Sequence, residues 1–226
     1  MNLLDQSLGQ LARKISGATQ IFHDYQLDFC CGGKHSLREA ALAGGLDPEA
    51  IAARLEGLQA MSQSGDRDWS AASPTELVDH LLVRFHALHR QQLPELIRLA
   101  RRVEEVHGDR VDCPTGLAEH LSVLQQELES HMQKEEQVLF PLLARGHGAM
   151  AGSPITMMRM EHDQHGVTLQ GLSDLTQNIT LPRGACNTWR ALYLGLRTFR
   201  EDLMEHIHLE NNILFENATA GQPLHA

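Results

Sequence analysis

Aromatic residues, long apolar runs and positive charge are all scarce in this chain of 226 residues. It has 42% apolar but only 4% aromatic residues, so we expect an aliphatic core, which suits helices better than a sheet sandwich. The net charge of −10 argues against nucleic acid or an anionic membrane as the main partner. The chain contains no run of about 18 apolar residues, the length needed to span a membrane. The amphipathic N-terminus lacks the apolar centre of a signal peptide. These absences predict a cytoplasmic protein.

Cysteine is also infrequent, whereas histidine is abundant. The four cysteines do not form a disulfide framework in a chain of this length. Fourteen histidines are spread along the chain, mostly within helical patterns, which excludes a tag. Histidine is the commonest metal ligand and also transfers protons near neutral pH, so the spacing of these residues has to decide between the roles.

The apolar periodicity predicts an all-α protein. We expect an antiparallel up-down-up-down four-helix bundle over residues 74–220, because short connections between long helices favour antiparallel neighbours. A polar linker over residues 62–73 separates the bundle from a small helical domain at residues 1–61. Short helices are expected in that domain at residues 3–16, 19–25, 36–43 and 48–61.

The start of the bundle has its own signal. Ser73 can cap a helix, Pro74 suits the first helical position, and Glu76 completes a capping box. Pro94 and Pro141 lie inside helical patterns and are expected to kink or end them. The four bundle helices are predicted at residues 74–107, 115–145, 154–178 and 184–218.

The second and fourth of these helices carry the same pattern of acid, histidine, glutamate, leucine and phenylalanine. Residues four apart share one helix face, and apolar neighbours on that face turn it inward. Buried carboxylates and imidazoles are costly unless something compensates them. The two sets are Glu127, His131, Glu135, Leu139 and Phe140, and Asp202, His206, Glu210, Leu214 and Phe215.

The first and third helices repeat as well. A His-x-x-His pattern occurs at His86 and His89, and again at His162 and His165. The bundle therefore reads as a duplicated helix pair, in which each half supplies one histidine and one His-x-x-x-Glu. Spacing alone leaves the choice within each His-x-x-His pair open. Four histidines and two glutamates are expected to converge on one centre.

These ligand types indicate which metal is held. A single His-x-x-x-Glu is more often a surface ion pair, and His35 and Glu39 show that spacing outside the bundle. Two inward-facing copies with matched histidines indicate a metal site instead. Structural zinc sites usually include thiolate, for which Cys113 and Cys186 are poorly placed. Six nitrogen and oxygen ligands, with two glutamates able to bridge, suit a pair of octahedral iron or manganese ions.

Five segments carry a further resemblance. They are Asp79-His80…Arg84-Phe85-His86, Ser130-His131-Met132-Gln133-Lys134-Glu135-Glu136, Glu161-His162-Asp163, His206-Ile207-His208-Leu209-Glu210-Asn211-Asn212 and, near the N-terminus, Asp28-Phe29-Cys30-Cys31-Gly32-Gly33. The four bundle segments resemble the hemerythrin-like family. The N-terminal segment is similar to the small domain in one branch of that family, the di-iron proteins that repair iron–sulfur centres after oxidative or nitrosative damage.

The resemblance implies two iron ions, Fe²⁺ or Fe³⁺, bridged by the carboxylates of Glu135 and Glu210. It decides for His86 over His89 and for His162 over His165. The implied ligand set is His86, His131, Glu135, His162, His206 and Glu210.

Two further pairs of residues have both a functional and an ordinary interpretation. Glu127 and Glu161 lie close to ligands, where they would line an access route or hold hydrogen bonds to the ligands, or they are partly solvated acids. Cys30 and Cys31 would carry thiol redox chemistry or handle iron, since the helix predicted to begin near Ser36 would lower a thiol pKa. The ordinary interpretation is a pair of small buried residues.

The function implied by the resemblance is the repair of iron–sulfur clusters damaged by oxidative or nitrosative stress, by donation of iron. Damaged iron–sulfur proteins are then the partners, and a homodimer is compatible with the resemblance. Two alternatives use the same centre with a small oxidant: an enzyme that binds and reduces nitric oxide, and a hemerythrin that binds or senses oxygen. No nucleic acid and no membrane is expected as a partner.

Overall fold

The computed structural model describes residues 2–15, 18–29, 33–61 and 69–219. Within these ranges every regular element is helical, and a single bridge between Ser7 and Ser36 belongs to no strand. The prediction of an all-α protein is confirmed. None of the helices in the described ranges is long and apolar enough to cross a membrane.

Contacts divide the chain into two units. One comprises Val78–Leu203, and the other comprises Met1–Leu77 together with Met204–Ala226. The second division point falls inside a continuous helix, α10, which runs from Asn187 to Leu209.

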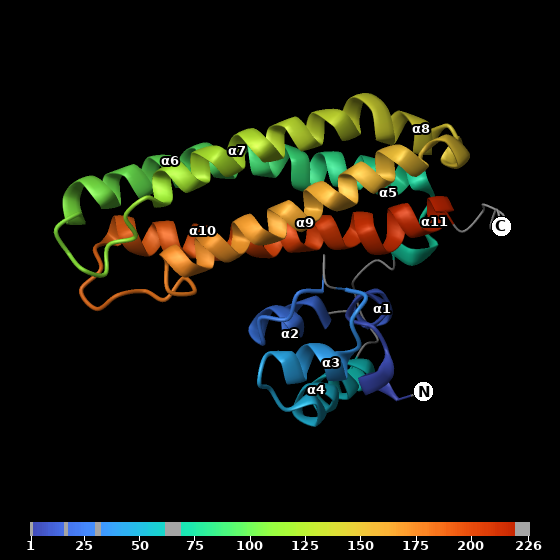
Figure 1. Cartoon of the computed structure of the whole chain (residues 1–226), viewed down its shortest axis with the longest axis horizontal. Coiled ribbons are helices and arrows are strands. Elements are labelled where there is room, and N and C mark those ends of the chain that lie inside the picture. Colours follow the sequence, from blue (N-terminus) through green and yellow to red (C-terminus); the bar gives the residue numbers. More distant parts are fainter. Residues whose placement is uncertain (1, 16–17, 30–32, 62–68, 220–226) are drawn as a thin grey trace. The chain divides into compact units, whose positions relative to one another are not determined.

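Four long helices form the bundle: α6 Ala87–His107, α7 Leu117–Lys134, α9 Gly152–Leu175 and α10 Asn187–Leu209 (Figure 1). Shorter helices extend them: α5 Pro74–Leu81, α8 Phe140–Ala144 and α11 Phe215–Thr219. Helix α6 packs on α7, and α7 packs on α9. The predicted four-helix bundle is therefore confirmed.

The capping box predicted at the start of the bundle is present. Glu76 accepts a hydrogen bond from the backbone nitrogen of Ser73 at 3.1 Å, and the backbone nitrogen of Glu76 donates to Ser73 Oγ at 3.3 Å. Helix α5 begins at Pro74 because these two side chains satisfy backbone donors that the first turn leaves open.

The third helix differs from its predicted bounds of 154–178. It begins two residues earlier, at Gly152, because Pro154 in the first turn has no backbone N–H to leave unsatisfied. It ends at Leu175, where Gln177 and Asn178 adopt positive φ angles of 50° and 56°. Pro94 also departs from expectation in part, since α6 continues through it to His107.

The bundle core is aliphatic, as the composition predicts. Along α7, four leucines at helical spacing are fully buried, namely Leu117, Leu121, Leu124 and Leu128. Helices α7 and α9 approach closely at Gly171, where a Cβ atom would lie 2.8 Å from the His120 ring. The same His120 donates from Nε2 to the Thr168 carbonyl at 2.8 Å, which links the two helices.

The N-terminal helices are α1 Leu8–Lys14, α2 Ala18–Asp24, α3 Leu37–Ala43 and α4 Pro48–Met61, after a 3₁₀ turn at Leu3–Asp5. The predicted first helix is split because Ser7 caps α1 and the Gln6 carbonyl accepts from the Leu37 backbone nitrogen at 3.0 Å. Glu39 forms a capping box with Ser36 at the start of α3. That role explains the His35–Glu39 spacing without a metal.

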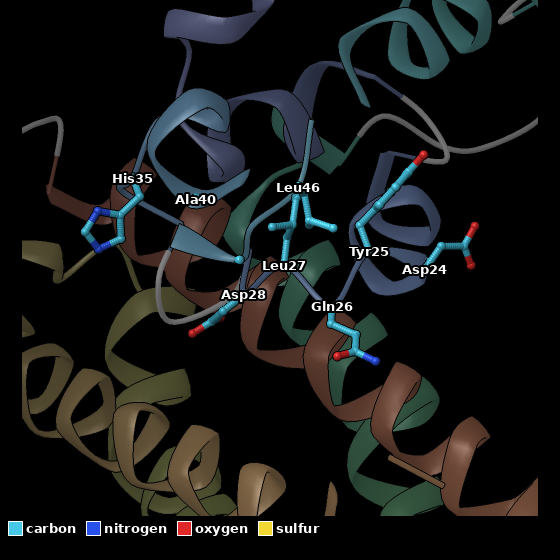
Figure 2. A pocket seen from close by; sticks show the side chains of 9 residues that line it. Asp24, Tyr25, Gln26, Leu27, Asp28, His35, Ala40 and Leu46 are labelled. Carbon is cyan, nitrogen blue, oxygen red and sulfur yellow. The ribbon is translucent and has the colours of Figure 1, made fainter. Parts of the chain in front are cut away.

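A cavity of about 630 Å³ opens on these N-terminal helices. Its wall combines polar and apolar residues, among them Asp24, Tyr25, Leu27, Asp28 and His35 (Figure 2).

Replacement of a single core leucine tests the packing of α7. Leu124→Ala removes a fully buried side chain and should lower the free energy of unfolding by about 2–5 kcal/mol. Val123→Ala, at a neighbouring side chain that is 44% exposed, is the matched control and should change it by less than about 0.5 kcal/mol. Urea unfolding of the iron-free protein measures both. Equal losses in the two variants would contradict this packing.

Candidate metal centre

Three π-helical turns interrupt the bundle helices, at Leu82–His86, Glu135–Leu139 and Glu210–Leu214. In the second, the backbone nitrogen of Phe140 donates to the Glu135 carbonyl, and in the third Phe215 donates to Glu210 in the same way. Single π turns inside α-helices occur frequently at functional sites. The repeated Glu-x-x-x-Leu-Phe pattern of the sequence is thus the segment that forms a π turn.

All six residues predicted as ligands are buried. Their exposed fractions are 0% or 1%, for His86, His131, Glu135, His162, His206 and Glu210. A carboxylate in such surroundings is strongly destabilised unless charge or hydrogen bonds compensate it. Two carboxylates among four imidazoles therefore need a positive partner.

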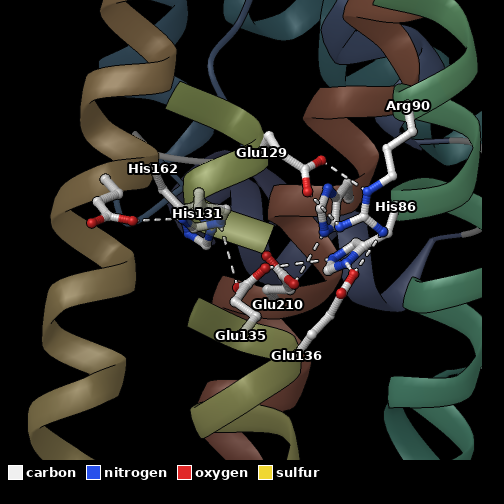
Figure 3. A network of polar contacts seen from close by, with 10 residues as sticks. His86, Arg90, Glu129, His131, Glu135, Glu136, His162 and Glu210 are labelled. Carbon is white, nitrogen blue, oxygen red and sulfur yellow. Dashed lines mark hydrogen bonds and ion pairs between the residues drawn. The ribbon is translucent and has the colours of Figure 1, made fainter. Parts of the chain in front are cut away.

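The imidazole Nε2 atoms face the carboxylates. His131 Nε2 lies 3.4 Å from Glu135 Oε1, and His86 Nε2 lies 3.5 Å from Glu135 Oε2. One glutamate thus presents its two oxygens to two different histidines (Figure 3).

Two other contacts have the same character. His131 Nε2 lies 3.1 Å from His162 Nε2, and His206 Nε2 lies 3.1 Å from Glu210 Oε1. Bonds of about 2.1 Å at right angles around one ion place neighbouring donor atoms about 3 Å apart. The observed separations are of this size.

Two overlapping groups of donor atoms result, each with all atoms within 4.8 Å of one another. One group is His86, Glu135, His206 and Glu210, and the other is His131, Glu135, His162 and Glu210. Glu135 and Glu210 belong to both. Of the two His-x-x-His pairs, the groups contain His86 and His162 and do not contain His89 or His165, within the residues that the structure describes.

The excluded histidines have other surroundings. His89 is buried, its Nδ1 lies 3.3 Å from Gln92 Oε1, and its ring contacts that of Phe199. His165 is also buried and its ring lies against the His131 ring, with centroids 4.9 Å apart. Helical angle could not separate His86 from His89 because a π turn ends at His86 and shifts the register of the first helix.

Carboxylates hold the far nitrogens of two of the imidazoles. His131 Nδ1 donates to Glu161 at 2.9 Å, and Lys134 also contacts Glu161. The hydrogen bond from His131 and the contact with Lys134 lower the pKa of Glu161 to about 2 although partial burial opposes the change. Glu161, which the sequence predicts to hydrogen-bond to the ligands, contacts His131, one of the predicted ligands.

The second of these carboxylates was not predicted from the sequence. His86 Nδ1 donates to Glu136 at 2.8 Å, and Arg90 Nη1 donates to the same carboxylate at 2.9 Å (Figure 3). Arg90 also binds Glu129 through two of its nitrogens. Glu136 follows Glu135 directly in the sequence, but the direction of its side chain depends on the π turn that begins at Glu135.

Glu127 and Asp202, the acids that begin the two repeated patterns, differ in their hydrogen bonding. Glu127 has one buried oxygen without a hydrogen-bond partner in the described part of the chain. It lines a pocket of about 350 Å³ together with Lys134, Glu161 and His165. Its counterpart Asp202 is bound instead, by Arg84 at 2.6 Å and by Gln92 at 2.7 Å.

The turn after Glu210 is packed against the N-terminal helices, within one contact unit. Arg13 Nη1 donates to the Asn212 carbonyl at 2.8 Å, and the Phe29 ring lies 5.6 Å from the ring of His208. A Cβ atom on Gly9 would lie 2.4 Å from Asn212 Oδ1, so a larger residue there would have to displace the Asn212 side chain. The small N-terminal domain therefore contacts the segment that carries Glu210.

The predicted cysteine pair, Cys30 and Cys31, lies outside the described residues, and its role stays a prediction. The other two cysteines are partly buried and belong to neither donor group. Cys186 Sγ lies 3.3 Å from His107 Nε2. Backbone donation from Trp189 and the His107 contact lower its pKa to about 7, whereas burial raises the pKa of Cys113.

Comparison with known proteins decides the family. Residues 77–218 match the hemerythrin HHE cation binding domain. The chain belongs to this family. Residues 4–59 match a second family, a domain of unknown function (DUF542), so both parts of the hemerythrin-like chain have relatives.

Two curated relatives match almost the whole length. Proteins of Yersinia pseudotuberculosis serotype O:1b (strain IP 31758) and Yersinia pestis (strain Pestoides F) are each 51% identical over 222 residues. The match covers 98% of this chain and 100% of each relative. Both relatives are named iron–sulfur cluster repair protein YtfE.

The donor set fits the cation that the family name implies. Fully buried carboxylates and imidazole Nε2 atoms at ligand-like separations supply both the negative charge and the nitrogen donors that iron accepts. Thiolate is absent from the two donor groups, which makes a structural zinc site a poor fit.

The thiol pKa values predict selective alkylation. Iodoacetamide at pH 7.5 should modify Cys186 at least several-fold faster than Cys113, because about half or more of the Cys186 thiol is ionised. Peptide mass mapping over time gives the rate at each cysteine. His107→Ala removes one of the contacts that lower the pKa and should slow the reaction of Cys186 at that pH. Faster modification of Cys113 would contradict the assigned environments.

Proposed function

We propose that this chain binds two iron ions and repairs iron–sulfur clusters damaged by oxidative or nitrosative stress, by donating iron in the cytoplasm. The observation that carries the proposal is the membership of Glu135 and Glu210 in both donor groups. Each group has two histidines of its own, and the two glutamates supply carboxylates to both. The full-length similarity to proteins named for iron–sulfur cluster repair supports the cellular role.

The ligand roles follow from the donor atoms. His86 and His206 would hold one ion, and His131 and His162 the other, with Glu135 and Glu210 bridging. The two oxygens of Glu135 face different histidines, as a bridging carboxylate requires. When bound, the iron pair supplies exchangeable ferrous ions and a ferrous–ferric redox couple.

The chain's own residues make these ligands ready to bind. The Glu161 carboxylate accepts from His131 Nδ1, so the proton stays on Nδ1 and the Nε2 lone pair faces the centre. The buried Phe140 ring packs against the His86 ring and keeps bulk water from that side of the site. Exchange then needs a polar route, and the pocket lined by Glu127, Lys134 and Glu161 is the proposed one.

Iron content tests the ligand assignment. The reconstituted wild-type protein should hold about two irons per chain, as expected for a pair of octahedral sites. Glu135→Ala removes a donor common to both groups and should leave less than about one iron, measured by elemental analysis. Glu119→Ala, at an exposed glutamate on the same helix, is the matched control and should retain the wild-type content. A full complement of iron in Glu135→Ala would contradict the bridging role.

Iron transfer tests the function. Reduced protein, mixed with an apo iron–sulfur protein, sulfide and a thiol, should restore the acceptor's cluster absorption faster than the same amount of ferrous salt in the presence of a ferrous chelator. Glu210→Ala should lose this advantage because the chain no longer delivers the ion. A rate equal to that of free iron would exclude donation. Turnover of nitric oxide to nitrous oxide by the same protein would then favour the enzymatic alternative.

The cysteine pair has a separate test. A Cys30→Ala/Cys31→Ala variant should keep about two irons, since neither residue is among the proposed ligands, but should transfer iron several-fold more slowly if the thiols handle iron. Cys113→Ala/Cys186→Ala is the matched control. Unchanged transfer in the Cys30/Cys31 variant would assign the pair to an ordinary packing role.

A further inference from the structure

Both nitrogens of the His86 ring have carboxylate neighbours. Its Nδ1 lies 2.8 Å from Glu136 Oε1, and its Nε2 lies 3.5 Å from Glu135 Oε2. The ring is fully buried and packs against that of Phe140, with centroids 5.5 Å apart. Since an ionised carboxylate only accepts hydrogen bonds, the contact with Glu136 places the ring proton on Nδ1 and leaves the Nε2 lone pair toward the donor groups.

Glu136 is itself fixed by the helix opposite. Arg90 on α6 donates to Glu136 from Nη1 at 2.9 Å and holds Glu129 on α7 with Nε and Nη2, at 2.8 and 3.1 Å. The guanidinium is planar, so its two bonds to Glu129 determine where its third donor points. The three side chains form one hydrogen-bonded chain that ends on His86 (Figure 3).

We propose that Glu136 and Arg90 are positioning residues that hold His86 as an Nε2 donor and thereby set how tightly one of the two irons is retained. This inference rests on the proposed function, because it takes His86 as a ligand. A carboxylate behind a metal-bound imidazole fixes its tautomer and orientation and makes it a more basic ligand. The effect falls on one position only, since His86 belongs to one of the two donor groups.

The other half of the site gives the comparison. There the carboxylate behind His131 is Glu161, and its cation is Lys134, which is half exposed. Lysine is a point charge on a flexible stem and makes no fork, whereas Arg90 bridges two carboxylates. The two iron positions therefore have differently supported histidines, and loss of Glu136 should change one position while the other is kept.

Chelator competition on the full-length protein tests the proposal. In Glu136→Ala, one of the two ferrous ions should bind roughly 10- to 100-fold more weakly, measured by titration with a chromophoric ferrous chelator. Glu136→Gln should recover part of the affinity, because the amide oxygen still accepts from Nδ1. Arg90→Met should give an intermediate loss. Glu95→Gln, at an exposed glutamate paired with Arg98 on α6, is the matched control and should bind as the wild type does.

Two further measurements separate the possible outcomes. Thermal unfolding of the iron-free variants detects a purely structural role, which would lower their stability while both iron affinities stay at wild-type values. Mössbauer spectra of the loaded protein should show one altered iron of the two in Glu136→Ala. Wild-type affinity and spectra in that variant would overturn this inference alone, whereas a wild-type protein without iron would overturn the proposed function itself.

Discussion

The centre of this bundle depends on compensation of buried negative charge. Glu135 and Glu210 are fully buried, and each shares its surroundings with imidazoles that point their Nε2 atoms inward. Without a cation, such carboxylates would destabilise the fold, because burial removes the hydration that stabilises their charge. In the proposed iron-bound protein, the same groups would link the helices of the bundle through the ions. Under the proposed function, stability and iron binding would depend on the same six side chains.

The π turns explain how the helices present these groups. Each of the two glutamates opens a π turn, and His86 closes another, whereas α9 is an uninterrupted α-helix. A π turn adds one residue and rotates the residues beyond it, so the same helix can direct a histidine and a glutamate inward and then return apolar residues to the core. The two halves of the duplicated pattern are therefore not structurally identical. Their acids also diverged, with Asp202 bound by Arg84 and Glu127 left beside a pocket.

The carboxylates that hydrogen-bond to the Nδ1 atoms of two proposed ligands lie outside the repeated pattern. Glu161 precedes His162 in the chain but binds His131 on another helix, and Glu136 follows Glu135 but binds His86. Each carboxylate therefore connects two helices while neighbouring a ligand in sequence. This cross-linking fixes ring orientation before any ion is bound, which limits the reorganisation that binding requires.

Helical class, the capping box at Ser73 and the spacing of His131, Glu135, His206 and Glu210 could all be read from the sequence, because they depend on local periodicity and on chemistry within one or two turns. Spacing along the chain could not decide between His86 and His89, since both are buried and a π turn that ends at His86 shifts the register of the helix. Nothing in the local sequence distinguishes Arg90 and Glu136 from ordinary surface charges. Only tertiary packing gives them a role, because their partners lie across a helix pair, where hydrogen-bond geometry depends on how the helices approach rather than on spacing along the chain.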